Sequence, residues 1–377
     1  MDLVRLKERN SALLRQEIAR GATRLESLPE VVNLNHTNIC NLKCPFCVTT
    51  HEKYHSRLSR DVIERVADAL FPSARKAVLT MAGEPLAADF DLIADAARRF
   101  AVKLDMVTNA VLLTPRRYGE IRGVLDHLNV SLDSNVPEIY ERLRSGASFE
   151  KVHAHLRGIQ ELRERDPDDV LLTLSAVVQR SNLEGLPDFV RFAGGLGVDG
   201  VLLQHLLETR LTGEQDPDSN PGREVVNSHL REASRAAREA GVNLVFVGFP
   251  LPNVIVDPPR PRVAEPIASD GICGYLVQNF NVLFTGEVYP CCVPTDHVLG
   301  NVREQDPVEI WNGPAFVRLR EAHRSKRGTP FCSGCGMAPH LKPRRPAWIN
   351  ERVKTARRWW RHVRGLRERA RSAGANP

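Results

Sequence analysis

The chain has 377 residues and 42% hydrophobic content, which is enough for about two domains with well-filled cores. It contains no apolar run of about 18 residues and no apolar signal segment near its start, which argues against a membrane-spanning or secreted protein. The net charge of +6 is uneven, because residues 341–377 carry 12 Lys or Arg and only two acidic residues. We therefore expect a cytoplasmic protein whose basic character is confined to its tail.

The first predicted elements lead to a group of three cysteines. Residues 1–30 predict a polar helical lead-in, and residues 31–35 predict a short strand. Cys40, Cys44 and Cys47 follow with the spacing Cys-x3-Cys-x2-Cys. A structural zinc site normally closes with four ligands, whereas a cubane iron–sulfur cluster held by three cysteines keeps one iron open. The triplet therefore favours an open iron–sulfur site. The alternative is a zinc knuckle with a distant fourth ligand, either His36 or His51.

Strand-like apolar runs and amphipathic helical stretches alternate along the next part of the chain, as in βα units around a parallel sheet. The predicted strands are residues 31–35, 76–81, 102–107, 127–133, 171–178 and 200–205. The predicted helices lie near residues 60–70, 87–100, 115–123, 149–164 and 186–196. Six such units with right-handed crossovers predict an α/β fold, an open partial (βα)6 barrel. Ligand sites in parallel sheets lie at the carboxyl ends of the strands.

Two elements together resemble the radical S-adenosylmethionine (SAM) superfamily. One is the cysteine triplet with Phe46 before its last cysteine. The other is the run Ala82-Gly83-Glu84-Pro85, which resembles a Gly-Gly-Glu-Pro element with alanine in the first position. The resemblance implies that the triplet binds a [4Fe–4S] cluster whose open iron chelates SAM. It also implies that an external one-electron donor of the flavodoxin or ferredoxin type reduces the cluster, and that SAM cleavage yields a 5′-deoxyadenosyl radical.

The same resemblance assigns SAM contacts to residues at several strand ends. Phe46 would lie against the adenine, and Gly83, Glu84 and Pro85 would receive the ammonium group. Ser131 and Asp133, on one face of a strand, would lie near the ribose, and Arg144 would bind the carboxylate. Arg142 is the alternative to Arg144.

Further candidates for contact with SAM or substrate are Thr108, Asn109, Asn182, Gln204 and His205. The alternative for Glu84 is a structural role as an acid at a helix N-terminus. The alternative for the further candidates is a role as turn or cap residues.

A second set of cysteines lies between residues 273 and 335. The spacing Cys273-x12-Gly286-x4-Cys291 predicts a hairpin with its turn at Thr285-Gly286, and the pair Cys332-x2-Cys335 supplies two more thiolates. This pattern resembles the twitch domain, the shorter relative of the SPASM domain of radical SAM enzymes. No cysteine follows Cys335, so the resemblance implies one auxiliary [4Fe–4S] cluster.

The remaining thiol belongs to Cys292, next to Cys291. The glycine spacing favours Cys291 as the cluster ligand. Cys292 then either packs in the core, as free cysteines often do, or donates a hydrogen atom that quenches a substrate radical. The second possibility would make the enzyme a redox-neutral epimerase.

The domain boundaries that follow from these patterns define four segments. They are a lead-in (1–30), a radical SAM barrel (31–250), a twitch or SPASM-like cluster domain (251–340) and a basic helical tail (341–377). The tail combines arginines with Trp348, Trp359 and Trp360, which could contact an anionic membrane surface or pack on the barrel. No nucleic-acid-binding module is recognisable, so no specific nucleic acid is expected.

The favoured function is oxidation or epimerisation of a sugar, aminocyclitol or related natural-product intermediate. The alternative is a maturase that crosslinks or oxidises a ribosomal peptide or a partner protein. About 30 residues before the first strand are too few for a leader-recognition domain, so a small molecule is favoured over a peptide. A third possibility is a non-catalytic iron–sulfur or zinc scaffold, which would not cleave SAM.

Overall fold

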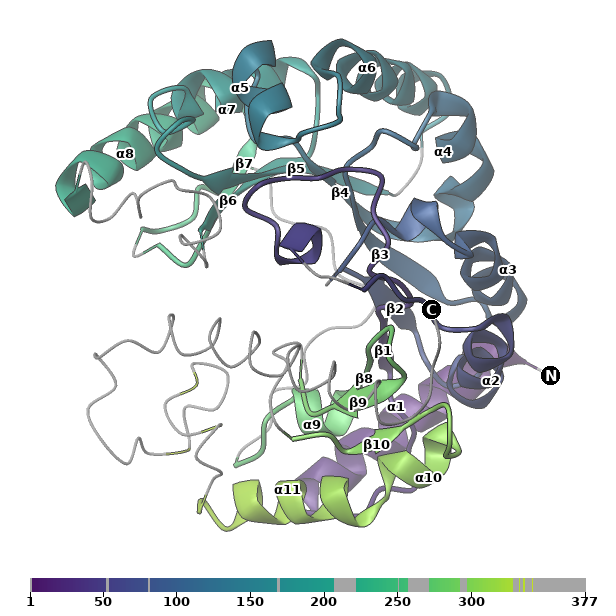
Figure 1. Cartoon of the computed structure of the whole chain (residues 1–377). Helices are drawn as coiled ribbons and strands as arrows, with labels where there is room; N and C mark the ends of the chain where they lie inside the picture. Colours follow the sequence, from purple (N-terminus) through teal and green to yellow (C-terminus); the bar gives the residue numbers. More distant parts are fainter. Residues whose placement is uncertain are drawn as a thin grey trace.

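A computed structural model gives the architecture of the chain. It describes residues 2–51, 54–80, 82–167, 170–206, 222–249, 251–256, 271–291 and 297–327, together with residues 332, 335 and 341. Within this part of the chain, the strands form a ten-stranded sheet in the order β10-β9-β8-β1-β2-β3-β4-β5-β6-β7. The sheet curves into an open arc, with helices α2 to α8 along its outer side (Figure 1). The α/β fold with a parallel, barrel-like sheet is confirmed.

The six predicted strands are present within a few residues of their expected bounds. They are β1 (Val31–Leu34), β2 (Lys76–Leu79), β3 (Lys103–Thr108), β4 (Leu125–Ser131), β5 (Leu171–Val178) and β6 (Gly200–His205). The structure adds a seventh parallel strand, β7 (Asn243–Val247), beside β6. This strand was not predicted, although its buried residues Leu244 and Phe246 alternate with more exposed ones.

Helices cover the outer side of the sheet and flank its lower part. The longer ones are α1 (Leu3–Ala19), α2 (Arg60–Leu70), α3 (Phe90–Phe100), α4 (Pro115–Ile121), α5 (Pro137–Leu143), α6 (Phe149–Arg165), α7 (Leu186–Gly195), α8 (Arg223–Ala240) and α11 (Pro314–Arg324). The shorter ones are α9 (Tyr275–Gln278), α10 (Pro307–Trp311), η1 (Val48–His51), η2 (Pro85–Ala87) and η3 (Arg122–Val124). The five helices predicted between the strands are present as α2, α3, α4, α6 and α7, whereas α5 and α8 were not predicted.

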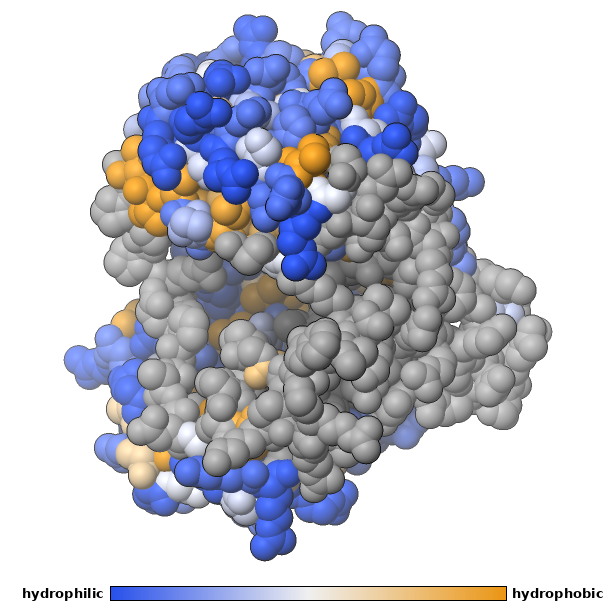
Figure 2. Space-filling view, turned by 90° about the vertical axis from the view of Figure 1, so that its left-hand side faces the viewer, coloured by the Kyte–Doolittle hydropathy of each residue, from blue (hydrophilic) through white to orange (hydrophobic). Residues whose placement is uncertain are grey.

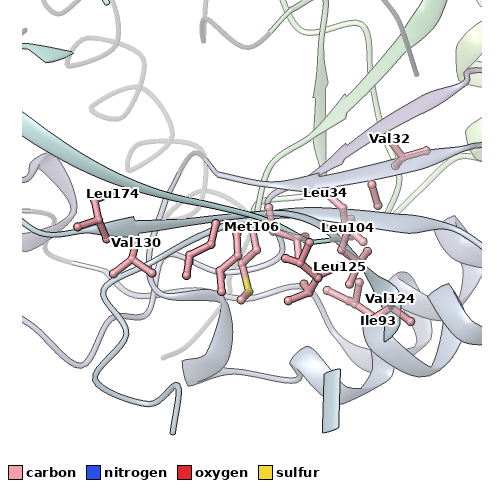
Figure 3. Packing of buried hydrophobic residues seen from close by; sticks show 14 of the residues in the cluster. Val32, Leu34, Ile93, Leu104, Met106, Val124, Leu125, Val130 and Leu174 are labelled. Atoms are coloured by element: carbon pink, nitrogen blue, oxygen red, sulfur yellow. The ribbon is translucent and has the colours of Figure 1, made fainter. Parts of the chain in front are cut away.

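The core lies between the outer face of the sheet and these helices. Alternate residues of each strand point toward the helices, as Leu104 and Met106 of β3 and Val130 of β4 show (Figure 3). Ile93 of α3 meets them from the helical side, because α3 buries residues at helical spacing. The opposite face of the strands carries polar side chains, such as Asn129 and Ser131 of β4 and Thr173 and Ser175 of β5. The inside of the arc is therefore the face that could bind a polar ligand.

The predicted hairpin is present and continues the same sheet. Its arms are β8 (Asn279–Val282) and β9 (Glu287–Tyr289), with the short strand β10 (Gly300–Asn301) beyond them. Gly286 has a φ of +87° in the turn, and a Cβ there would lie 2.5 Å from the Asn301 side chain, so only glycine fits. β8 pairs in parallel with β1, which places the second cysteine module directly beside the strand that leads to the first cysteines.

The described residues contain no helix long and apolar enough to cross a membrane. From the open side of the arc, hydrophilic residues cover much of the upper outer surface, and some hydrophobic residues are set back between its upper and lower parts (Figure 2). The predicted basic tail, apart from Leu341, lies outside the described residues, and so do Trp348, Trp359 and Trp360.

Candidate active site

The three cysteines of the first group lie on the connection between β1 and η1, on the inner side of the arc (Figure 1). The Cys47 amide donates to the Cys44 carbonyl at 3.1 Å, which closes a tight turn between these two residues. The Lys43 amide donates to the Ser145 carbonyl at 2.9 Å, and Asn109 Nδ2 donates to Asn41 Oδ1 at 2.9 Å. The cysteine loop is therefore attached to the end of β3 and to the turn after α5.

The thiols of this loop suit an iron–sulfur cluster. Burial raises the pKa of the Cys44 thiol to about 11 and also raises that of Cys40, while the nearby Arg144 guanidinium partly opposes both shifts. Bound iron would offset this cost by stabilising the thiolates. Among the described residues, no three Cys, His, Asp or Glu side chains lie close enough together to hold one metal ion between them. A cubane cluster takes each cysteine at a separate iron, so the donor set fits that group.

The two histidines considered as zinc ligands have ring nitrogens close to backbone carbonyls. His36 Nε2 lies 2.6 Å from the Ala88 carbonyl oxygen, and His51 Nε2 lies 2.7 Å from the Pro45 carbonyl oxygen. The second contact joins η1 to the cysteine loop. Both rings therefore contact backbone carbonyl groups near the cysteine loop.

The run Gly83-Glu84-Pro85 lies against the backbone that precedes Cys40. Gly83 has a φ of +64°, and a Cβ there would lie 2.6 Å from the Ile39 carbonyl oxygen, so a side chain would not fit. The Glu84 amide donates to the same carbonyl at 2.8 Å. The glycine predicted from the motif is therefore required by the close approach of two backbones.

The Glu84 side chain joins the ends of two strands. Its carboxylate accepts hydrogen bonds from Thr108 Oγ1 at 2.7 Å, from the Asn109 amide at 2.8 Å and from the Leu86 amide at 3.3 Å. The last contact caps η2, as the alternative interpretation expected. Burial raises the pKa of Glu84, and the hydrogen bonds oppose this shift. Three predicted residues therefore form one buried network, and their contact with SAM stays a prediction.

A second buried network surrounds Asp133 and Arg144. Asp133 follows β4, and its carboxylate accepts a hydrogen bond from the Val177 amide at 2.8 Å and pairs with Arg144. The Arg144 guanidinium lies 5.3 Å from the centre of the Phe46 ring. Arg142 is exposed, so the structure brings Arg144 and not Arg142 to the cysteine loop.

The remaining strand-end candidates have identifiable backbone roles. Asn182 Nδ2 donates to the carbonyls of Asp133 and Val177, and its Oδ1 accepts from the Gln179 amide, which fixes the turn after β5. Ser131 is buried at the end of β4. His205 packs against Phe249 with ring centres 5.1 Å apart, and Gln204 precedes it on β6. Direct contacts of these residues with SAM or substrate stay predictions.

Three cysteines of the second group, Cys273, Cys332 and Cys335, lie near one another. Cys332 and Cys335 share a turn through a 3.2 Å hydrogen bond, and their charges act on Cys273, whose pKa burial raises to about 11. Cys291 directly follows Tyr289-Pro290 at the end of β9, and Cys292 lies outside the described residues. The described thiols fit an auxiliary cluster, with Cys291 as the predicted fourth ligand.

Several residues that support these sites were not predicted from the sequence. The Cys273 amide donates to Nδ1 of the buried His323 at 3.3 Å, and Ser145 and Asn41 hold the first loop. The Ser145 contact runs between backbone groups, and the His323 and Asn41 contacts join residues far apart in the sequence, so none leaves a local residue pattern. Only Gly146, with a φ of +99° next to Leu42, offered a local signal of a tight turn.

Comparison with protein families accounts for both groups of cysteines. Residues 34–193 match the radical SAM superfamily, and residues 273–336 match the SPASM family, an iron–sulfur cluster-binding domain. This chain is a radical SAM enzyme. Its cofactors are SAM, a [4Fe–4S] cluster and an auxiliary iron–sulfur cluster. The two matches lie within the predicted segments 31–250 and 251–340, whose boundaries stay predictions.

This radical SAM enzyme is similar to several known proteins. It is 25% identical to the PqqA peptide cyclase of Rhodopseudomonas palustris over 322 residues, which are 82% of this chain and 79% of the relative. It is 30% identical over 188 residues to a probable GTP 3′,8-cyclase of Sulfolobus acidocaldarius, 49% of this chain and 57% of the relative. A crystal structure of Streptococcus suis SuiB bound to precursor peptide SuiA shares its fold, with a TM-score of 0.57 and 16% identity, over 83% of this chain and 71% of SuiB.

These comparisons correct one expectation. A small-molecule substrate was expected to be favoured over a peptide, and this is wrong. PqqA peptide cyclases align with most of this radical SAM enzyme, and SuiB, which shares its fold, was crystallised with a precursor peptide. The length of the segment before β1 was therefore a poor guide to the substrate class.

Proposed function

We propose that this radical SAM enzyme modifies a peptide substrate by removing a hydrogen atom from one of its C–H bonds. The observation that carries the proposal is the extent of the alignment with PqqA peptide cyclases. It spans 82% of the chain, whereas the probable GTP cyclase aligns over 49%. An alignment of that length extends beyond residues 34–193, so the similarity to peptide cyclases is not confined to the radical SAM domain.

The arrangement of the site supports the chemical part of the proposal. Cys40, Cys44 and Cys47 would hold the [4Fe–4S] cluster, and Cys273, Cys332 and Cys335, with Cys291, would hold the auxiliary cluster. When bound, the first cluster and SAM supply the organic radical that removes the hydrogen atom, after reduction by an external donor of the flavodoxin or ferredoxin type. The protein itself positions the reactants and excludes water.

The buried networks at the carboxyl ends of the strands perform that positioning. Glu84 is 1% exposed and fixes the backbone of Asn109, which in turn contacts the cysteine loop through Asn41. Asp133 is fully buried and pairs with Arg144 next to Phe46. Rigid surroundings of this kind keep reacting groups within the narrow geometry that hydrogen transfer needs.

Isotope transfer tests the proposed substrate class. The anaerobically reconstituted enzyme is incubated with SAM, dithionite and one of two pools: uniformly deuterated synthetic peptides, including the PqqA peptide, or deuterated sugars and nucleotides, including GTP. We expect deuterium in 5′-deoxyadenosine and a mass change in the substrate only with the peptide pool. Deuterium transfer from the second pool alone would contradict the proposal. The mass change of the peptide separates epimerisation, which exchanges one deuterium for a solvent hydrogen, from oxidation and crosslinking, which each remove two hydrogen atoms. Fragmentation of the peptide then separates the last two, because a crosslink joins two residues.

A further inference from the structure

Both carboxylate oxygens of Asp133 accept hydrogen bonds from protein groups. The residue has 0% exposure. One carboxylate oxygen accepts from the Val177 amide at 2.8 Å, and the other accepts from Arg144 Nε. The backbone carbonyl of Asp133 also accepts from Asn182 Nδ2 at 2.8 Å. Because the carboxylate has no exposed surface, a sugar hydroxyl could reach it only if the surrounding protein groups moved apart.

Arg144 extends the network from Asp133 to the cysteine loop. Its guanidinium stacks over Phe46 at 5.3 Å, and Phe46 directly precedes Cys47. The Ser145 carbonyl accepts the Lys43 amide at 2.9 Å, one residue before Cys44. The turn at residues 144–146 therefore contacts the loop at two places, and Asp133 fixes the side chain that makes one of these contacts.

We propose that Asp133 is a positioning residue, which holds the cysteine loop through Arg144 and Phe46 and does not bind the ribose of SAM. It ties the loop to the end of β5, because the same carboxylate holds Val177 and the same residue holds Asn182. This inference concerns the cofactor site alone and does not depend on the peptide substrate.

Combining one substitution with two SAM analogues separates positioning from ribose binding. The dissociation constants of SAM and of its 2′-deoxy and 3′-deoxy analogues are measured by calorimetry for the reconstituted wild type and Asp133→Asn. A positioning residue weakens binding of all three compounds by the same factor. A direct hydrogen bond from ribose to the carboxylate would instead make the loss about tenfold or more smaller for the analogue that lacks the bonded hydroxyl. That second result would overturn the proposal.

Retention of the first cluster supplies an independent readout. We expect Asp133→Asn to lose iron to a chelator faster than the wild type and to change the electron paramagnetic resonance spectrum of the reduced, SAM-bound cluster. The matched control is Asp126→Asn, on β4, whose carboxylate pairs with Lys76 at 2.6 Å and does not contact the loop. An iron-loss rate for Asp133→Asn equal to that of this control would also overturn the proposal.

Arg144→Lys keeps the test decisive if Asp133→Asn does not fold. Lysine preserves a positive charge for Asp133 but lacks the planar group that covers Phe46. We expect this variant to lose iron faster than the wild type, while SAM and both deoxy analogues bind with unchanged ratios. Wild-type iron retention in Arg144→Lys would contradict the role given to the Asp133–Arg144–Phe46 contact.

Discussion

The two ends of the barrel both contain buried polar networks, but they connect different kinds of structure. At the amino end, Lys7 of α1 donates to the carbonyls of Ala74 and Ala101, just before β2 and β3. Glu30, just before β1, accepts hydrogen bonds from Ser11 and from Gln278. These contacts attach α1 to the segments that precede the strands, so their role is structural.

At the carboxyl end, the networks instead connect loops that carry the cofactor ligands. Glu84 joins the turns after β2 and β3, and Asp133 joins the ends of β4 and β5 to Arg144. Buried carboxylates therefore connect the helix and strands at the amino end, whereas we propose that those at the carboxyl end maintain the geometry of the cofactor site. Substitutions at the two ends should therefore separate in what they change.

The largest expected effect is that of Cys44→Ala at the carboxyl end. Loss of one of three ligands should remove the first cluster, so iron content falls by about four atoms per chain and 5′-deoxyadenosine formation drops to background. Cys332→Ala is the matched control, because it also removes one buried cysteine but affects the auxiliary site. It should retain SAM cleavage in the absence of substrate. Equal loss of cleavage in both variants would contradict the assignment of the two groups.

Glu84→Gln should mainly weaken SAM binding. The substituted amide places an N–H donor against the Asn109 amide or Thr108 hydroxyl, which disturbs the turns beside the cysteine loop. We expect an increase of about tenfold to a hundredfold in the dissociation constant of SAM, measured by calorimetry on the reconstituted enzyme.

Glu30→Gln is the same substitution at the amino end, where the side chain is also buried. It should lower the free energy of unfolding by about 1–3 kcal/mol and leave the dissociation constant of SAM within about twofold of the wild type. If Glu30→Gln weakened SAM binding as much as Glu84→Gln, the proposed division between the two ends would be wrong.

The sequence predicted the elements of the fold better than the contacts between them. Apolar periodicity placed β3 and β5 correctly, because it depends on local burial. The pairing of Asp133 with Arg144 depends on how α5 returns to the sheet, and the contact of Glu84 with Asn109 depends on strand register. Neither is local. The Ser145 and His323 contacts involve backbone groups, so no residue pattern could have indicated them.

Lys7→Met tests the amino end through pH. Burial lowers the pKa of Lys7 to about 8 from 10.5, so between these values the folded protein binds fewer protons than the unfolded chain. The stability of the wild type relative to Lys7→Met should therefore rise with pH, by about 2 kcal/mol between pH 7 and pH 9.5. Urea unfolding at both pH values measures this difference. A difference that stays constant or falls with pH would contradict the burial of a charged ammonium group here.

Arg116→Ala should have the smallest effect of these substitutions. Arg116 pairs with Glu120 at 3.1 Å on the outer helix α4, and its side chain is 90% exposed, so water competes with the ion pair. Arg116 also lies near the helix N-terminus, where a positive charge is unfavourable, and this offsets part of the attraction. The free energy of unfolding should change by less than about 0.5 kcal/mol, with SAM affinity unchanged. A loss as large as that of Glu30→Gln would show that charge pairs outside the two buried networks also hold the barrel together.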